Sequence, residues 1–229
     1  MMKRILVSAA TVLLFALTAR AADRPPDIKK VIETMQASYA GVSSYHATLV
    51  AQARIGEALG AEQTIDLLFE KPNKMLMRWT GVTNHDQEVL FENGKVHGRR
   101  GGLLSFIDFT LDPKDPHVLK ESPRPLTEIG LGPLVGRLAK EVTAALDDKS
   151  AALKTSFANW NDARCVKIDI AFDATDPECH CSHATIYLTP DTQLPAGYFA
   201  YDDSDELVER YEYKDIQLNV TIPPDRFHL

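Results

Sequence analysis

The sequence has little cysteine and no excess of basic residues. Only three of its 229 residues are cysteine, which is too few for a domain held together by disulfides, and an odd number leaves at least one thiol outside an internal pair. Lysine and arginine together number 25 against 32 acidic residues, so the formal net charge is −7. Because such a chain has no basic excess to neutralise phosphates, we expect no nucleic-acid partner.

The sequence also lacks an apolar run long enough to span a bilayer, which takes about 20 residues. Its most apolar run, Ile5 to Leu17, follows two basic residues and precedes the small-x-small site Ala19–Ala21. This pattern is typical of a signal peptide, so we expect cleavage after Ala21 and export to the periplasm. Residues 22–229 are then expected to form a single domain that does not span the membrane.

The short motifs that mark common catalytic sites are missing. We find no Gly-x-Ser-x-Gly elbow, no His-Glu-x-x-His pair and no glycine-rich phosphate loop. His46 follows two serines, but adjacent residues of a strand point to opposite faces, so we interpret His46 as structural. We therefore expect a protein that is not an enzyme and needs no cofactor.

Apolar spacing predicts two amphipathic helices. Apolar residues recur at helical spacing from Ile28 to Tyr39, with Gly41 as a stop, and again between Thr127 and Leu146. The segment Gly101 to Leu126 contains four prolines and no sustained period. It is predicted to be a long irregular segment, a type that is often functional.

Two-residue alternation predicts an antiparallel sheet. Asn93-Gly94 is a strong hairpin signal, a phase change is expected near Lys214-Asp215, and the short polar turns require antiparallel neighbours. The predicted strands are Tyr45–Ile55, Thr64–Phe69, Lys74–Trp79, Glu88–Glu92, Lys95–Arg99, Leu153–Trp160, Arg164–Phe172, Ala184–Leu188, Ala196–Tyr201 and Leu207–Val220.

Four segments share one context, because each begins or ends a predicted strand. They are Val42–Ala47, Phe69–Asn73 with a basic residue before Pro-Asn, Glu88–Lys95, and Tyr213–Asn219 followed by Phe227. In this order they resemble the outer-membrane lipoprotein carrier (LolA/LolB-like) superfamily, and the chain looks like an uncharacterised bacterial member of it.

The resemblance implies an α+β fold, in which a curved antiparallel β-sheet forms an unclosed half-barrel with helices covering its concave face. It implies that Lys71, where the carriers typically have arginine, contacts the helical lid; a solvated strand-end lysine is the alternative. It also implies an apolar cavity for acyl chains. Six residues that alternate along two strands are the candidates to line it, with an ordinary core as the alternative: Ile65, Leu67, Phe69, Met75, Met77 and Trp79.

One short segment concentrates residue types that bind metals. Its side chains suit Zn²⁺ or Cu(I), although their spacing matches no zinc framework, so we do not expect a metal there. A disulfide to Cys165 is another possibility. A turn near Pro177 would place Cys165 opposite Thr189 and away from the other cysteines, so the pairing stays open. The residues of this segment are Cys179, His180, Cys181 and His183.

These observations together predict a non-enzymatic, exported protein that binds the acyl chains of a lipid or lipoprotein. An alternative is a sensor or interaction module that contacts an envelope protein through the same fold. A less favoured alternative is a metal- or redox-active protein built on Cys179–His183.

Overall fold

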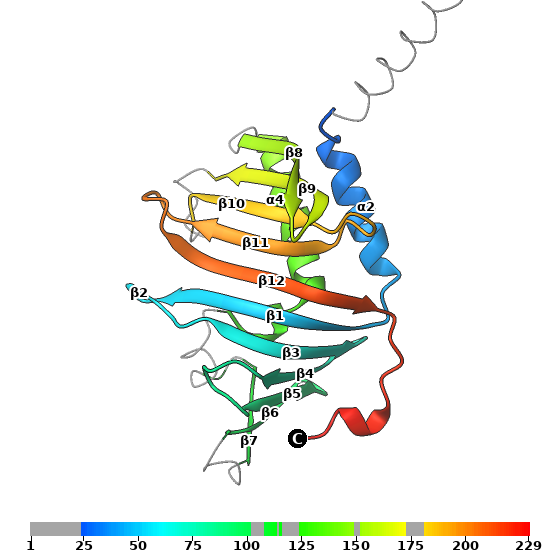
Figure 1. Ribbon diagram of the computed structural model, residues 1–229, viewed down its shortest axis with the longest axis vertical. Coiled ribbons are helices and arrows are strands. Elements are labelled where there is room, and N and C mark those ends of the chain that lie inside the picture. The colour runs from blue at the N-terminus through cyan, green and yellow to red at the C-terminus, as the bar shows by residue number, and fades with distance from the viewer. Residues whose placement is uncertain (1–23, 102–107, 114, 116–123, 149–151, 173–180) are drawn as a thin grey trace, which may run out of the picture.

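The fold is known from a computed structural model, shown in Figure 1, which describes residues 24–101, 108–113, 115, 124–148, 152–172 and 181–229. The predicted signal peptide, residues 1–21, lies outside the described residues. Within them, a single 12-stranded sheet is covered on one face by two α-helices. None of the described helices is long and apolar enough to cross a membrane.

The helices and strands follow the predicted order. The helices are α2 (Ile28–Ala40), η2 (Leu126–Glu128), α4 (Leu131–Asp148) and η3 (Pro224–Arg226). The strands before α4 are β1 (Ser44–Ile55), β2 (Ala58–Leu59), β3 (Gln63–Glu70), β4 (Lys74–Trp79), β5 (Glu88–Glu92), β6 (Lys95–Arg99) and β7 (Asp108–Leu111). The strands after it are β8 (Ala152–Trp160), β9 (Ala163–Ala171), β10 (His183–Leu188), β11 (Pro195–Tyr201) and β12 (Leu207–Leu218).

The sheet is antiparallel and unclosed. Its order is β7-β6-β5-β4-β3-β1-β12-β11-β10-β9-β8, with β2 paired to β1 off this path. The two meanders therefore meet where the first long strand, β1, pairs with the last, β12. The predicted α+β half-barrel is confirmed, and we call the helix-covered face of the sheet its concave face.

Local sequence explains where the helices begin and end. Asp27 caps α2, because its carboxylate accepts the backbone N–H groups of Lys29 at 2.9 Å and Lys30 at 3.2 Å. The predicted helix from Thr127 to Leu146 is instead two helices, η2 and α4. They are separated at Gly130, which has a φ of +108°. Glycine adopts this conformation readily, and it is incompatible with a continuous α-helix.

Two turn predictions are confirmed. Asn93 and Gly94 both have positive φ, 52° and 73°, as the tight hairpin between β5 and β6 requires. The phase change predicted near Lys214-Asp215 is a register shift between β1 and β12, next to Asp215 with φ 53°.

The prediction of an irregular segment from Gly101 to Leu126 is wrong in one part. Strand β7 lies within it and pairs with β6. Gly98 leaves room for the Phe109 ring across this pair, because a Cβ at Gly98 would lie 2.0 Å from the ring as it is placed. A four-residue edge strand is too short for alternation to be recognised. Residues 102–107, 114 and 116–123 lie outside the described residues.

The C-terminal tail covers part of the opposite, convex face. Asn219 begins the tail, and its side-chain oxygen accepts the backbone N–H of Ser43 at 2.8 Å. Figure 1 shows the tail running past β1 and β3 to end beside β5. Phe227, only 2% exposed, packs there in a second apolar cluster with Leu68, Leu76 and Leu90.

Candidate functional site beneath the helices

The six residues predicted to line a cavity lie together on the concave face. Strands β3 and β4 pair them directly across the sheet, five of the six are buried, and Phe69 is half-buried and stacks on Tyr45 with 5.0 Å between ring centroids. The pairs are Ile65 with Trp79, Leu67 with Met77, and Phe69 with Met75. The alternation along each strand therefore marks one continuous apolar surface.

This apolar surface is packed shut in the structure. Leu67 is 0% exposed and Met77 is 1% exposed, and both belong to one core cluster with apolar residues of both helices. The helical members of the cluster include Val31, Ile32 and Met35 of α2, and Leu131, Leu134, Leu138 and Val142 of α4. A ligand on this surface would have to displace helix side chains.

Lys71 contacts the end of α2. Its Nζ donates to the carbonyl oxygens of Tyr39 at 3.0 Å and Ala40 at 3.2 Å, and it lies 4.7 Å from the centroid of the Tyr39 ring. A cation at these carbonyls neutralises the negative end of the helix dipole. The amine thus ties the end of β3 to the end of α2, while a lid function for α2 stays a prediction.

Replacing Lys71 with methionine is expected to loosen α2. The variant keeps the apolar stem and loses both hydrogen bonds, at a cost of about 1 kcal/mol, so amides of α2 should exchange roughly fivefold faster. Hydrogen exchange followed by mass spectrometry measures this. Lys71→Arg keeps the charge and serves as the control, and unchanged α2 protection in Lys71→Met would contradict the assignment.

A buried ionic cluster, which the sequence did not reveal, lies on the same concave face beside the apolar surface. Glu209 of β12 is only 4% exposed. Arg124 donates to both of its carboxylate oxygens, at 2.7 Å from Nε, and the Tyr211 hydroxyl donates at 3.1 Å. Burial raises the pKa of the Glu209 carboxyl, but Arg124 outweighs burial and leaves this pKa below its usual range.

A second arginine of the cluster comes from α4. The Arg137 guanidinium lies 4.7 Å from the Tyr198 ring centroid, with Nη1 3.7 Å from a Glu209 oxygen and Nε 3.9 Å from a Glu141 oxygen. Burial raises the pKa of the Glu141 carboxyl above its usual range. Arg137 Nε and Glu141 Oε2 are buried without a hydrogen-bond partner in the described structure.

The start of α4 is fixed to the sheet by a buried tyrosine. The backbone N–H of Leu131 donates to the Tyr45 hydroxyl at 3.2 Å, and Tyr45 is 0% exposed. Gly130 fits here because a Cβ would lie 2.7 Å from that hydroxyl. The start of α4 is thus hydrogen-bonded to β1, and Arg137 of α4 lies close to Glu209 of β12 in the ionic cluster.

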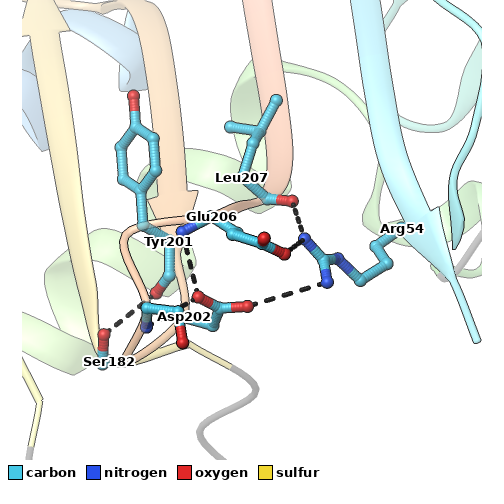
Figure 2. A network of polar contacts seen from close by, with 7 residues as sticks. Arg54, Ser182, Tyr201, Asp202, Glu206 and Leu207 are labelled. Atoms are coloured by element: carbon cyan, nitrogen blue, oxygen red, sulfur yellow. Dashed lines mark hydrogen bonds and ion pairs between the residues drawn. The ribbon is translucent and has the colours of Figure 1, made fainter. Parts of the chain in front are cut away.

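The strand that carries Glu209 is anchored at its beginning, as Figure 2 shows. Arg54, near the end of β1, donates through Nη2 to Glu206 at 2.9 Å and to the Leu207 carbonyl at 3.2 Å. Asp202 accepts the backbone N–H groups of Glu206 and Ser204, and these bonds hold the pKa of its carboxyl below its usual range. The acidic stretch of residues 202–206 therefore forms the hairpin turn between β11 and β12.

The cysteine predictions are resolved only in part. Cys165 is a buried free thiol that donates to the Ala158 carbonyl at 3.3 Å, so the structure contradicts a disulfide at Cys165. Val166 pairs with Leu188, the register that a turn near Pro177 gives. Cys179 and His180 lie outside the described residues.

The two described members of the Cys-His segment have separate surroundings. Cys181 packs against the main core cluster. His183 stacks on Tyr201, with 5.1 Å between centroids, and its Nε2 lies 3.4 Å from an Asp205 oxygen. Among the described residues, no three His, Cys, Asp or Glu side chains come together as a metal site.

His46 forms a polar pair on the convex face. Its Nε2 lies 2.5 Å from an oxygen of Asp66 on the neighbouring strand. The hydroxyl of Ser44, which shares this face, instead donates to the Val220 carbonyl at 2.6 Å. This arrangement agrees with the structural interpretation of His46.

Solved structures similar to this chain include a member of the LolA superfamily, the group that the sequence resembles. MucB is similar with a TM-score of 0.50 at 13% identity, over 88% of this chain and 62% of MucB, and MucB from Pseudomonas aeruginosa is also solved in complex with MucA. The lipoprotein LppX of Mycobacterium tuberculosis gives 0.49 at 12% identity, over 85% of this chain and 97% of LppX. A LolA-superfamily protein of Nitrosomonas europaea gives 0.39 at 8% identity, over 88% of this chain and 97% of that protein.

The chain belongs to the family described as "Protein of unknown function (DUF1571)", whose sequence profile matches residues 42–229. Comparison with curated proteins gives no match. At the identities of the similar structures, the likeness concerns the fold alone. What the chain binds must therefore be argued from its own residues.

Proposed function

We propose that this protein is a non-enzymatic periplasmic carrier that binds the acyl chains of a lipid or lipoprotein on its concave face. The observation that carries the proposal is the apolar surface of β3 and β4 beneath α2 and α4. Burying an acyl chain contributes about 0.8 kcal/mol per CH₂, so a chain could replace the packing of the helices. Met75 and Met77 are flexible enough to fit chains of varied shape.

The proposal is tested by native mass spectrometry of protein purified from the periplasm without detergent. We expect a noncovalent adduct of lipid mass that is lost on denaturation. Two variants of adjacent residues, each 1% exposed, sharpen the test: Met77→Gln on the concave face and Leu76→Gln on the convex face. An amide against the acyl chain costs about 1–3 kcal/mol, so we expect at least roughly tenfold lower lipid affinity in Met77→Gln only.

Circular dichroism is used to check that both variants are folded. Equal lipid binding by the two folded variants would contradict the concave face as the binding site. A bare protein mass from every preparation would contradict the carrier function.

A second candidate is an interaction module that holds another envelope protein. The fold of MucB, similar at a TM-score of 0.50, and the solved complex of MucB with MucA favour it. Co-purification of one stoichiometric protein partner, with no lipid mass, would support this candidate over the carrier.

A further inference from the structure

The hydrogen bonds of the ionic cluster are unevenly shared between its two arginines. Arg124 occupies both oxygens of Glu209, and the Tyr211 hydroxyl adds a third bond. The nearest carboxylate oxygens to Arg137 lie at 3.7 Å and 3.9 Å, beyond hydrogen-bonding distance. Within the described structure its buried Nε donates to nothing. Arg137 is therefore a cation with unused donors.

The surroundings of Arg137 favour an anionic partner. The side chain is 21% exposed, and its guanidinium stands over the Tyr198 ring. Glu141, the other carboxyl within 4 Å, comes no nearer than 3.9 Å to the Arg137 Nε. A partly buried, planar guanidinium is well suited to bind a carboxylate or phosphate, because such an anion can accept two of its N–H groups at once.

A row of paired residues leads from Arg137 to the apolar surface. Tyr198 pairs with Tyr211, Tyr211 with Ala51, and Ala51 with Gln63, crossing β11, β12, β1 and β3. Gln63 accepts the Trp79 Nε1 hydrogen at 2.8 Å, which reaches β4. Four strand spacings separate β11 from β4, about 19 Å along the sheet. This span fits a long acyl chain better than a short one.

We propose that Arg137 binds the anionic head group of an amphiphile, a carboxylate or a phosphate, whose long acyl chain lies toward Met77 and Trp79. This inference rests on the proposed carrier function and deepens it by naming the ligand class. In this arrangement α4 contacts the head group of the ligand, and β3 and β4 contact its acyl chain.

The test compares ligands that share a chain and differ in the head group. Delipidated full-length mature protein is titrated with hexadecanoate, hexadecyl phosphate and the neutral hexadecanol, with octanoate and inorganic phosphate alongside. We expect Arg137→Gln to weaken both anionic ligands at least tenfold and to change hexadecanol binding less than twofold. Arg137→Lys keeps the positive charge but not the planar guanidinium, so it should lose less affinity for the anionic ligands than Arg137→Gln. Arg54, which holds the turn between β11 and β12 on the convex side, provides the matched control. Arg54→Gln should leave the affinity for every one of these ligands unchanged.

Each outcome separates the two proposals. If the wild type binds hexadecanol as tightly as hexadecanoate, the head-group role of Arg137 is overturned and the carrier function stands. If inorganic phosphate alone competes as well as hexadecyl phosphate, the site takes a free anion and the amphiphile is excluded. If no sixteen-carbon ligand binds, the carrier function fails and this inference with it. Should Arg137→Gln not fold, the Arg137→Lys series and the wild-type ligand ratios still decide.

Discussion

Replacing Glu209 with glutamine is expected to lower the free energy of unfolding by about 3 kcal/mol. The substitution keeps the shape of the side chain and removes its charge, so Arg124 loses its buried anionic partner and Arg137 loses the nearest negative charge. The two arginines then lack the full negative charge of Glu209, so the cost of desolvating them is offset less well. Denaturant unfolding at neutral pH measures the loss.

The pH dependence of the difference provides a second check. The pKa of Glu209 in the folded protein lies below the usual value of 4.5 for a glutamate carboxyl, because Arg124 donates to it. A carboxyl with a lowered pKa stabilises the fold above its unfolded pKa, and this stability is lost as the pH falls through the folded pKa. The gap between wild type and Glu209→Gln should therefore be full at pH 7 and shrink below about pH 4.5.

The matched control for Glu209 is Glu206, which pairs with Arg54 and whose side chain is 64% exposed. Because solvent screens this pair, Glu206→Gln should change the unfolding free energy by less than about 1 kcal/mol. If both substitutions had the same small effect, the ionic cluster would not stabilise the fold as we argue.

Replacing Phe227 with alanine is expected to cost about 3 kcal/mol of stability. The ring is 2% exposed and fills the convex-face cluster with Leu68, Leu76 and Leu90. The Lys74 ammonium also lies 4.6 Å from its centroid. Truncation removes the apolar contacts and leaves a cavity or an unattached tail. Urea unfolding of the wild type and of Phe227→Ala measures the difference in unfolding free energy from the shift in the transition midpoint.

Phe227→Leu is the control for this second prediction, because it keeps most of the apolar volume and should lose less than about 1.5 kcal/mol. A loss below about 1 kcal/mol in Phe227→Ala would mean that the tail only rests on the sheet.

Much of the fold and of the apolar surface could be predicted, because local patterns in the sequence determine them. Ile65 and Leu67, like Met75 and Met77, alternate with residues of the opposite face because one face of each strand is buried. A period of two is visible in the sequence without knowledge of partners. Strand pairing through short turns is equally local, which is why the order of the two meanders could be predicted.

The ionic cluster could not be predicted, because it depends on how a helix lies over a distant strand. Arg137 and Glu209 approach only once α4 covers β12. One signal was present: Glu209 shares its strand face with Tyr211 and Tyr213, both buried beneath the helices. A carboxylate in the inward phase of a strand needs a buried partner. The sequence does not say which arginine provides it.

The pairing of β1 with β12 makes the middle of the sheet the meeting point of the chain's two ends. An interrupted chain that stopped before Leu207 would lack a central strand, and each remaining meander would present a bare edge to other chains. The apolar surface of β3 and β4 and the arginines that face β12 also fall on opposite sides of this seam. Their spacing is consequently a property of one strand pair, and a slip in its register would misalign the apolar surface and the ionic cluster at once.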